Sequence, residues 1–204
     1  MSRLVVFGCS ITHGQGLIDP QKEVWGAVLA QLLDKEFVNN GKPGASNKFI
    51  SHAVSKFNFE PDDFVIIAWT FLSRYSLLLD NETSHLSQTG KELPCINLRA
   101  ERQTNESITY FKYFYNEYDS NFNNSVFVDF TVDLLLHKQI NFKQIFYRAE
   151  ETPDCRHKNT NTFPFTIFPL YLRYPKASDN LHMGPLGNSH LADLMYEDTV
   201  GILR

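Results

Sequence analysis

Runs of hydrophobic residues alternate with polar segments along the chain, and the first run is the most compact. Residues 3–7 (Arg-Leu-Val-Val-Phe) are mostly β-branched or aromatic, and the run stops at Gly8. A short apolar run that ends at a glycine is typical of a buried strand. Comparable runs at 36–39, 64–69 and 142–147 predict three further strands.

Helical spacing of the apolar residues fills the intervals between these strands. Asp19 is expected as an N-cap and Pro20 suits the first helical position. Apolar residues then recur at three- and four-residue intervals as far as Leu33, which predicts one helix. Residues 45–57 predict the next helix, with Ser46 as its cap. Further helices are expected over 105–118, 126–137 and 193–203.

Strands and helices that alternate in this way favour parallel pairing through right-handed crossovers, and hence an α/β fold. The chain has 204 residues, 43% of them hydrophobic, which suffices for a single domain over 1–204 with a sizeable core. Residues 77–94 are polar and rich in turn formers, and they predict an excursion that acts as a lid or an oligomer contact. Pro164 and Pro169 predict that any fifth strand over 163–174 is short or irregular.

Charge and composition narrow the class of protein. The formal net charge is −4 and no basic stripe is present, which argues against a nucleic-acid partner. No apolar run approaches the length of a membrane span, and the start of the chain lacks the features of a signal peptide. A cytoplasmic protein without a membrane partner is therefore expected. Cys9, Cys95 and Cys155 are odd in number and widely spaced, which predicts free thiols.

Ser10 lies where the first strand is expected to end, in a turn that contains glycine on both sides. The carboxyl ends of parallel strands form the edge at which ligands bind in open α/β sheets. A serine hydroxyl is a weak nucleophile unless a base accepts its proton, so Ser10 is a candidate nucleophile only if such a base is near. The alternative is a turn serine that caps the next segment.

The candidate base lies near the other end of the chain, in the segment Asp179-Asn180-Leu181-His182. A carboxylate three residues before a histidine can accept a hydrogen bond from the imidazole Nδ1–H and leave Nε2 free to take a proton. The alternatives are a surface histidine and a turn-forming aspartate. His190 is a second possible base, but it is expected to be structural or exposed in the helix that follows.

Three blocks of the sequence together resemble the SGNH/GDSL hydrolases. They are Gly8-Cys9-Ser10, residues 40–47 (Asn-Gly-Lys-Pro-Gly-Ala-Ser-Asn) and the segment from Asp179 to His182, and they span most of the chain. The resemblance implies a flavodoxin-like three-layer α/β/α sandwich with a parallel sheet of about five strands. It also implies a serine ester hydrolase that uses Ser10, His182 and Asp179 and needs no metal or organic cofactor.

The resemblance also implies an oxyanion hole formed by the backbone amides of Ser10 and Gly44. The family's third donor is an asparagine, and Thr70 stands in its place. Four interpretations stay open: Thr70 substitutes poorly, another group such as Asn47 reaches in, the enzyme is slow, or the site no longer does chemistry. Gly44 is equally compatible with a plain Pro-Gly turn.

Three more side chains belong to this edge of the sheet. Trp69 is a candidate wall for an acyl or sugar group, and Arg74 is a candidate partner for an anionic substituent; the alternatives are rim packing and a solvated charge. Cys9 stands where the family usually has aspartate. It is expected to be a small buried thiol whose side chain points away from Ser10.

Two functions follow from these residues. The first is hydrolysis of a small-molecule or carbohydrate ester, by a small-acyl esterase or a carbohydrate O-deacetylase. The second is a structural or binding module that keeps the scaffold with weak or no activity, as the departures at Cys9 and Thr70 suggest. The geometry of the site distinguishes the two functions, because an enzyme needs Ser10 Oγ within hydrogen-bonding distance of His182 and His182 within hydrogen-bonding distance of Asp179.

Overall fold

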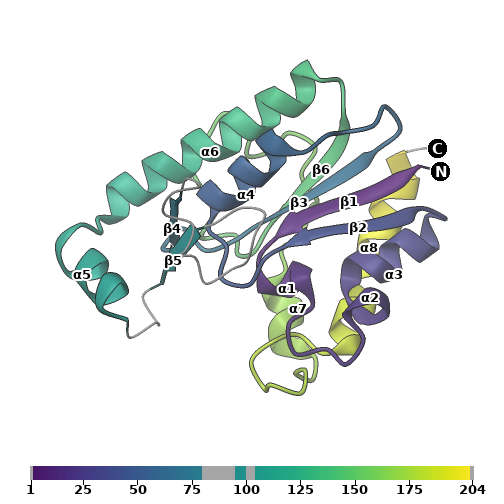
Figure 1. Ribbon diagram of the computed structural model, residues 1–204. Coiled ribbons are helices and arrows are strands. Elements are labelled where there is room, and N and C mark those ends of the chain that lie inside the picture. The colour runs from purple at the N-terminus through teal and green to yellow at the C-terminus, as the bar shows by residue number, and fades with distance from the viewer. Residues whose placement is uncertain (1, 80–94, 100–103, 203–204) are drawn as a thin grey trace.

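A four-stranded parallel sheet lies between two layers of helices in the computed structural model, which describes residues 2–79, 95–99 and 104–202 (Figure 1). The strand order is β2-β1-β3-β6, and neighbouring strands are parallel. The predicted strands are therefore confirmed, with ends that differ by one or two residues. Their bounds are β1 Arg3–Gly8, β2 Glu36–Gly41, β3 Phe64–Trp69 and β6 Asn141–Phe146.

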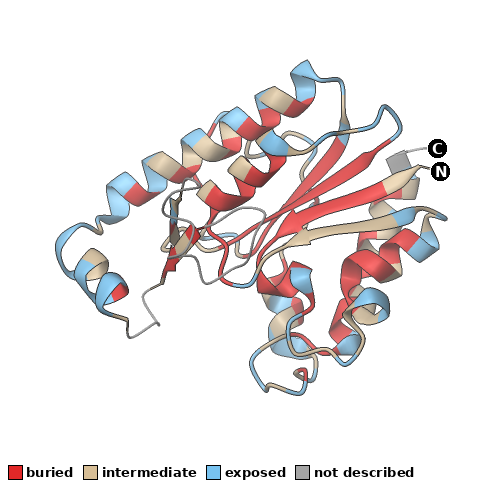
Figure 2. Cartoon of the chain, in the orientation of Figure 1, coloured by how far each residue is buried: buried red, intermediate tan, exposed pale blue. Residues whose placement is uncertain are grey.

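Both faces of the sheet are buried, which explains why its central strands are apolar throughout (Figure 2). Along β1, Leu4 and Val6 pack into one hydrophobic cluster, whereas Val5 and Phe7 pack into the other. The first cluster lies under α3 (Trp25–Leu32) and α8 (Pro185–Ile202), and the second under α4 (Asn47–Lys56) and α6 (Glu117–His137). The three-layer α/β/α sandwich is thus confirmed.

The single helix predicted from Pro20 to Leu33 is wrong, because the chain forms two helices there. They are α2 (Pro20–Glu23) and α3, and Val24 between them has extended backbone angles of φ −71° and ψ 145°. Asp19 precedes α2 but its side chain makes no capping bond. Instead, the Glu23 carboxylate accepts the N–H groups of Ile18 and Asp19, each at 3.1 Å.

The cap of α4 is as predicted. Ser46 Oγ accepts a hydrogen bond from the Phe49 N–H at 3.2 Å, and α4 begins at the next residue, Asn47. Ser46 is fully buried, and its hydroxyl also donates to Ser76 Oγ at 2.8 Å. The cap therefore joins α4 to the second, smaller sheet.

That smaller sheet is an antiparallel pair of strands, β4 (Tyr75–Leu78) and β5 (Cys95–Leu98). It forms the two ends of the excursion that was predicted over 77–94. Residues 80–94 of that excursion lie outside the described residues, so the expectation of a lid stays a prediction.

The helices over residues 105–137 divide differently from the prediction. The first, α5 (Asn105–Tyr113), is shorter than expected, and α6 starts nine residues earlier than the predicted helix over 126–137. Asn116 sets the new start, because its Oδ1 accepts the N–H groups of Tyr118 and Asp119 at 2.9 and 3.2 Å. A side-chain cap thus separates two helices within one aromatic segment.

The sheet has four strands in the described part of the chain rather than about five. Where a fifth strand would lie beside β6, a single parallel bridge joins Gln144 to Thr162. The chain then enters α7 (Phe168–Arg173), whose second residue is Pro169. The prolines in this segment prevent a longer strand, as predicted. No described helix has the length and hydropathy that crossing a membrane requires.

Candidate active site

Ser10 begins a short helix at the carboxyl edge of the sheet. β1 ends at Gly8, and the chain turns at Cys9 into α1 (Ser10–His13). A Cβ at Gly8 would lie 2.1 Å from Thr12 Oγ1, so the turn is too tight for any residue but glycine. Ser10 itself is only 6% exposed.

Asp179 and His182 form a pair in one loop. Asp179 Oδ2 lies 2.5 Å from His182 Nδ1, and Asp179 Oδ1 accepts the backbone N–H groups of Leu181 and His182 at 2.9 and 3.0 Å. Burial by itself would raise the pKa of the Asp179 carboxyl, but the Leu181 N–H, the imidazole and the His182 N–H together hold that pKa below its usual value. An ionised Asp179 orients the imidazole through Nδ1 and leaves Nε2 for other partners.

The loop that contains Asp179 and His182 is hydrogen-bonded to the turn that follows Ser10. The carbonyl oxygen of Gly16 accepts hydrogen bonds from both the N–H and the Oγ–H of Ser178, at 3.1 and 2.7 Å. A Cβ at Gly16 would lie 2.7 Å from the Asp179 carboxylate, and φ of +84° at Gly16 also favours glycine. Segments from the two ends of the chain are therefore joined directly after α1.

Ser10 and His182 are not hydrogen-bonded, in contrast to His182 and Asp179. Among the hydrogen bonds of the described residues, none joins Ser10 Oγ to His182. Catalytic hydrogen bonds are often long without substrate and tighten only in the complex. The arrangement thus meets one of the two geometric requirements for a triad, the contact between His182 and Asp179, and does not meet the other.

Gly44 lies in a loop held beside the end of β1. The N–H of Lys42 donates to the carbonyl oxygen of Gly8 at 3.0 Å, which joins the loop after β2 to the turn that carries Ser10. Gly44 is buried and has φ of +77°, a left-handed conformation that disfavours other residues. A Cβ there would lie 3.5 Å from the guanidinium of Arg99, a residue outside the three sequence motifs.

Thr70 and Asn47 are bound to each other through the Thr70 backbone. Asn47 Oδ1 accepts the Thr70 N–H at 2.8 Å, and Asn47 Nδ2 donates to Thr70 O and to Asn124 Oδ1. Asn47 is fully buried, so both ends of its amide hold the scaffold, and the interpretation that it reaches into the oxyanion hole is wrong for this arrangement. Thr70 Oγ1 accepts a hydrogen bond from Arg74 Nη1 at 3.0 Å.

Cys9 is buried, as predicted. Burial by itself would raise the pKa of the Cys9 thiol, yet the charge of Arg74, the Ile11 N–H and the neighbouring hydroxyls of Thr70 and Ser10 hold that pKa below its usual value. A buried thiol thus occupies the position at which the resembled family usually has a carboxylate.

The two candidate substrate-binding side chains differ in their surroundings. Trp69 is 1% exposed and donates from Nε1 to Gln144 Oε1 at 2.7 Å, so it belongs to the core and cannot form a wall of the site. Arg74 is half-buried, and its guanidinium carbon lies 4.5 Å from the centre of the Phe71 ring. Trp69 therefore packs in the core and does not contact the candidate site. Arg74, in contrast, lies next to this site.

The remaining histidines near the site have other contacts. His13 is exposed, and its Nδ1 lies 3.1 Å from Gly41 O. His190 lies on α8, where its ring centre is 5.4 Å from that of Tyr174. Within the described residues, no group of three or more His, Cys, Asp or Glu side chains could hold a metal ion.

Comparison with known proteins identifies the class of fold. No family model matches this chain, and no curated protein matches it in sequence. Among solved structures, it is similar to the psychrotrophic esterase EstA from Pseudoalteromonas sp., with a TM-score of 0.54 and 11% identity over 99% of this chain and 98% of that one. A lipolytic protein of the G-D-S-L family from Veillonella parvula gives a TM-score of 0.52 and 11% identity over 97% of both chains.

A carbohydrate esterase family 2 enzyme from Corynascus thermopiles is similar as well. Its TM-score is 0.51 and its identity 12%, over 99% of this chain and 66% of that one, which also has a carbohydrate binding domain. At such identities the likeness is one of fold. This chain therefore has the fold of the GDSL lipolytic proteins and carbohydrate esterases, and the resemblance found in its sequence motifs is confirmed at that level.

Proposed function

We propose that this protein is a serine-dependent ester hydrolase with Ser10, His182 and Asp179 as its triad. The observation that supports the proposal is the Asp179–His182 pair, 2.5 Å apart, seated on the turn that follows Ser10. The motifs carry these three residues in the order that the resembled family uses. Further support is that Ser10 follows the carboxyl end of β1 and that Ser178, next to Asp179, is bonded to Gly16, because α/β proteins bind their ligands at this edge of the sheet.

In this mechanism, Ser10 Oγ attacks the acyl carbonyl while His182 Nε2 takes its proton. Asp179 holds the imidazole through Nδ1 and stabilises the imidazolium. The tetrahedral intermediate then expels the alcohol, which receives the proton from His182, and an acyl-enzyme remains on Ser10. Water attacks the acyl-enzyme with the same base, and the acid leaves as Ser10 regains its proton.

Stabilisation of the oxyanion is the weaker part of this site. The backbone amides of Ser10 and Gly44 are the proposed donors, and both belong to loops that meet at Gly8. Thr70 is the proposed third donor, although its hydroxyl oxygen already accepts a hydrogen bond from Arg74. Loss of one oxyanion donor typically slows acyl transfer by about 10²–10³, so we expect a slow enzyme.

Small acyl groups are the proposed substrates, on a small molecule or a carbohydrate. The similar structures include esterases and a carbohydrate esterase, which supports ester bonds as the class of substrate. Removal of O-acetyl groups from a carbohydrate is the form of this activity to test first. Acetylated oligosaccharides and p-nitrophenyl acetate are suitable substrates, and release of acetate is the readout.

Labelling with a fluorophosphonate, followed by intact-mass measurement, tests the nucleophile. Wild type should gain one adduct, Ser10→Ala none, and Cys9→Ala one. Cys9→Ala is the matched control because it removes the neighbouring nucleophilic group and keeps the serine. An adduct on Ser10→Ala that disappears when Cys9 is also replaced would move the nucleophile to the thiol and contradict the proposal.

The second candidate is a module that keeps the fold without efficient chemistry. Two observations favour it: Ser10 and His182 are not hydrogen-bonded, and Thr70 replaces the expected asparagine. A folded wild type that takes no adduct and releases no acetate would support this candidate. A search for a bound sugar or protein would then be the next experiment.

A further inference from the structure

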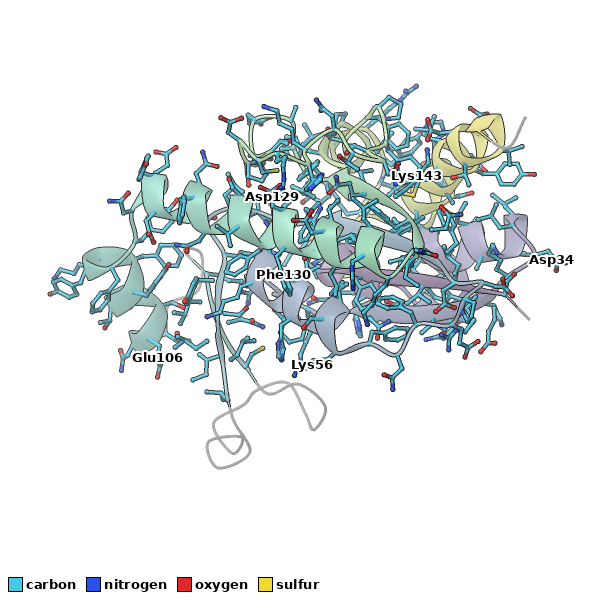
Figure 3. All side chains as sticks on the ribbon, turned by 90° about the horizontal axis from the view of Figure 1, so that it is seen from above. Asp34, Lys56, Glu106, Asp129, Phe130 and Lys143 are labelled. Carbon is cyan, nitrogen blue, oxygen red and sulfur yellow. The ribbon has the colours of Figure 1, made fainter. Side chains whose placement is uncertain are left out.

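Helix α7 leads into the loop over residues 175–184, which contains the candidate base and which we call the base loop. Leu170 on α7 packs into the hydrophobic cluster under α3 and α8, and Ile11 on α1 belongs to the same cluster. Helix α6, on which Figure 3 labels Asp129 and Phe130, packs on the cluster at the opposite face of the sheet. Side chains of α7 therefore reach the base loop from the α8 side of the sheet.

One peptide group of the base loop is bound at both of its ends. It joins Leu181 to His182, and its N–H donates to Asp179 Oδ1 at 3.0 Å. Its carbonyl oxygen accepts a hydrogen bond from the hydroxyl of Tyr171 on α7 at 2.9 Å. Because a peptide group is planar, bonds at both ends fix its rotation. The Cα of His182 belongs to this plane, so the two bonds also fix the direction in which the imidazole leaves the backbone.

The ring of Tyr171 is itself held in place. It stacks on the ring of Phe168, with centres 6.0 Å apart and planes 15° apart, and its centre lies 6.4 Å from that of Tyr147. The Nζ of Lys176 lies 3.5 Å from the centre of the Tyr171 ring. A side chain packed on several sides in this way presents its hydroxyl from a fixed position.

We propose that Tyr171 is a positioning residue of the candidate active site and acts through its hydroxyl on the imidazole of His182. This inference rests on the proposed function, in which His182 is the base. Ser10 and His182 are not hydrogen-bonded in the structure, so their contact must form when substrate binds. The direction of the imidazole decides whether Nε2 then reaches the serine hydroxyl.

The hydrogen bond between Tyr171 and Leu181 lies at the surface of the molecule. A water molecule can replace the hydroxyl there and satisfy the carbonyl oxygen of Leu181. Such a water is not attached to α7, however, and does not hold the peptide group in one orientation. Loss of the hydroxyl should therefore affect the reaction more than it affects folding.

Replacement of Tyr171 by phenylalanine tests the proposal, because it removes the hydroxyl and keeps the ring. A displacement of about 1 Å at a catalytic group can cost about 10²-fold in rate, and a partial loosening should cost about tenfold. The rate of labelling by a fluorophosphonate and kcat with p-nitrophenyl acetate should each fall by about this factor. KM should stay the same, because the base acts in both acylation and deacylation and both steps slow together.

Proton NMR provides a readout that does not depend on activity. The Nδ1 proton between His182 and Asp179 lies in a short, charge-assisted hydrogen bond, so it should resonate far downfield. In Tyr171→Phe this resonance should move upfield, because a loosened pair forms a longer hydrogen bond.

Tyr174→Phe is the matched control. Tyr174 directly follows α7, and its ring packs against His190 on α8, with centres 5.4 Å apart. Its labelling rate, kcat and Nδ1 proton resonance should match those of wild type. Both variants should unfold at the urea concentration at which wild type unfolds.

Three results would overturn the proposal. If Tyr171→Phe matches an active wild type in rate and resonance, the triad stands and the role of Tyr171 is refuted. A loss of activity that lies only in KM would make Tyr171 a substrate contact, and a loss of folding would make its hydroxyl structural. A folded wild type that takes no label and releases no acetate would contradict the triad itself, and the role of Tyr171 with it.

Discussion

Gly16 and Ser178 are 162 positions apart, yet they decide where the candidate base lies. The carbonyl oxygen of Gly16 holds the Ser178 backbone and hydroxyl, and the absence of a side chain at Gly16 leaves space for the Asp179 carboxylate. A displacement of about 1 Å at a catalytic group can cost about 10²-fold in rate. At the scale of single residues, the proposed activity therefore depends on a glycine that does no chemistry.

Replacement of Gly16 by alanine tests this dependence. The new Cβ would lie 2.7 Å from the Asp179 carboxylate, so Asp179 and His182 must move, and kcat/KM should fall about 10²-fold. Gly14→Ala is the matched control, because Gly14 also has φ of +84° but its Cβ would meet Pro20. Both variants should lose similar stability, about 1 kcal/mol, in urea unfolding. Equal losses of activity in the two variants would refute a positioning role for Gly16.

At the scale of elements, side-chain caps set boundaries that the apolar pattern leaves ambiguous. The aromatic segment after residue 105 has continuous helical spacing, but Asn116 divides it into α5 and α6. In the same way, Glu23 holds the N–H groups before α2, and the chain becomes extended at Val24. The start of α6 in turn fixes which of its residues are buried.

Asn116→Ala should therefore weaken the start of α6. Its Oδ1 accepts two backbone N–H groups, and loss of an N-cap costs about 1 kcal/mol in the free energy of unfolding, measured with urea. Asn121→Ala is the matched control, since Asn121 is exposed inside α6 and alanine has the higher helix propensity. Asn116→Ala should lower the free energy of unfolding, whereas Asn121→Ala should raise it. A similar effect of both would mean that Asn116 does not cap.

At the scale of the whole molecule, an ion pair joins the start of β1 to the turn before β3. Arg3 Nε and Nη2 donate to the two carboxylate oxygens of Asp63 at 2.8 and 2.7 Å, and the Asp63 side chain is 1% exposed. Burial by itself would raise the pKa of Asp63, but the Arg3 bonds and the Glu60 N–H lower it. The folded state thus binds a proton at Asp63 less readily than the unfolded chain does.

This sign predicts how stability depends on pH. Because the pKa of Asp63 is lower in the folded state than in the unfolded chain, ionised Asp63 stabilises the fold at pH values above its unfolded pKa, which is about 4. This stabilisation is lost as the pH falls through the folded pKa. Asp63→Asn should lower the Tm at about pH 7, at a cost of about 2 kcal/mol. The difference in Tm between wild type and Asp63→Asn, measured by calorimetry, should become smaller at acid pH. A difference that stays constant down to about pH 3 would contradict this assignment.

The local sequence predicted those features that depend on neighbouring residues. The buried strands, the Ser46 cap and the pairing of Asp179 with His182 each arise within a few positions, where spacing fixes geometry. The loop at Gly44 could be predicted as a Pro-Gly turn for the same reason. The hydrogen bond from the Thr70 N–H to Asn47 could not, because Asn47 comes from another segment.

Only the tertiary structure decided which side chains are buried in the core and which lie at the surface. Trp69 is the last residue of the buried strand β3 and suited either the core or the rim, and its bond to Gln144 on β6 holds it in the core. The segment around Thr162 could have paired with β6 over several residues, but its prolines allow a single bridge. The sequence by itself thus determined the fold class and the candidate residues, because hydrophobic period and turn chemistry are local. Their mutual positions and the hydrogen bonds between Gly16 and Ser178 depend on contacts between distant segments, which only the folded chain brings together.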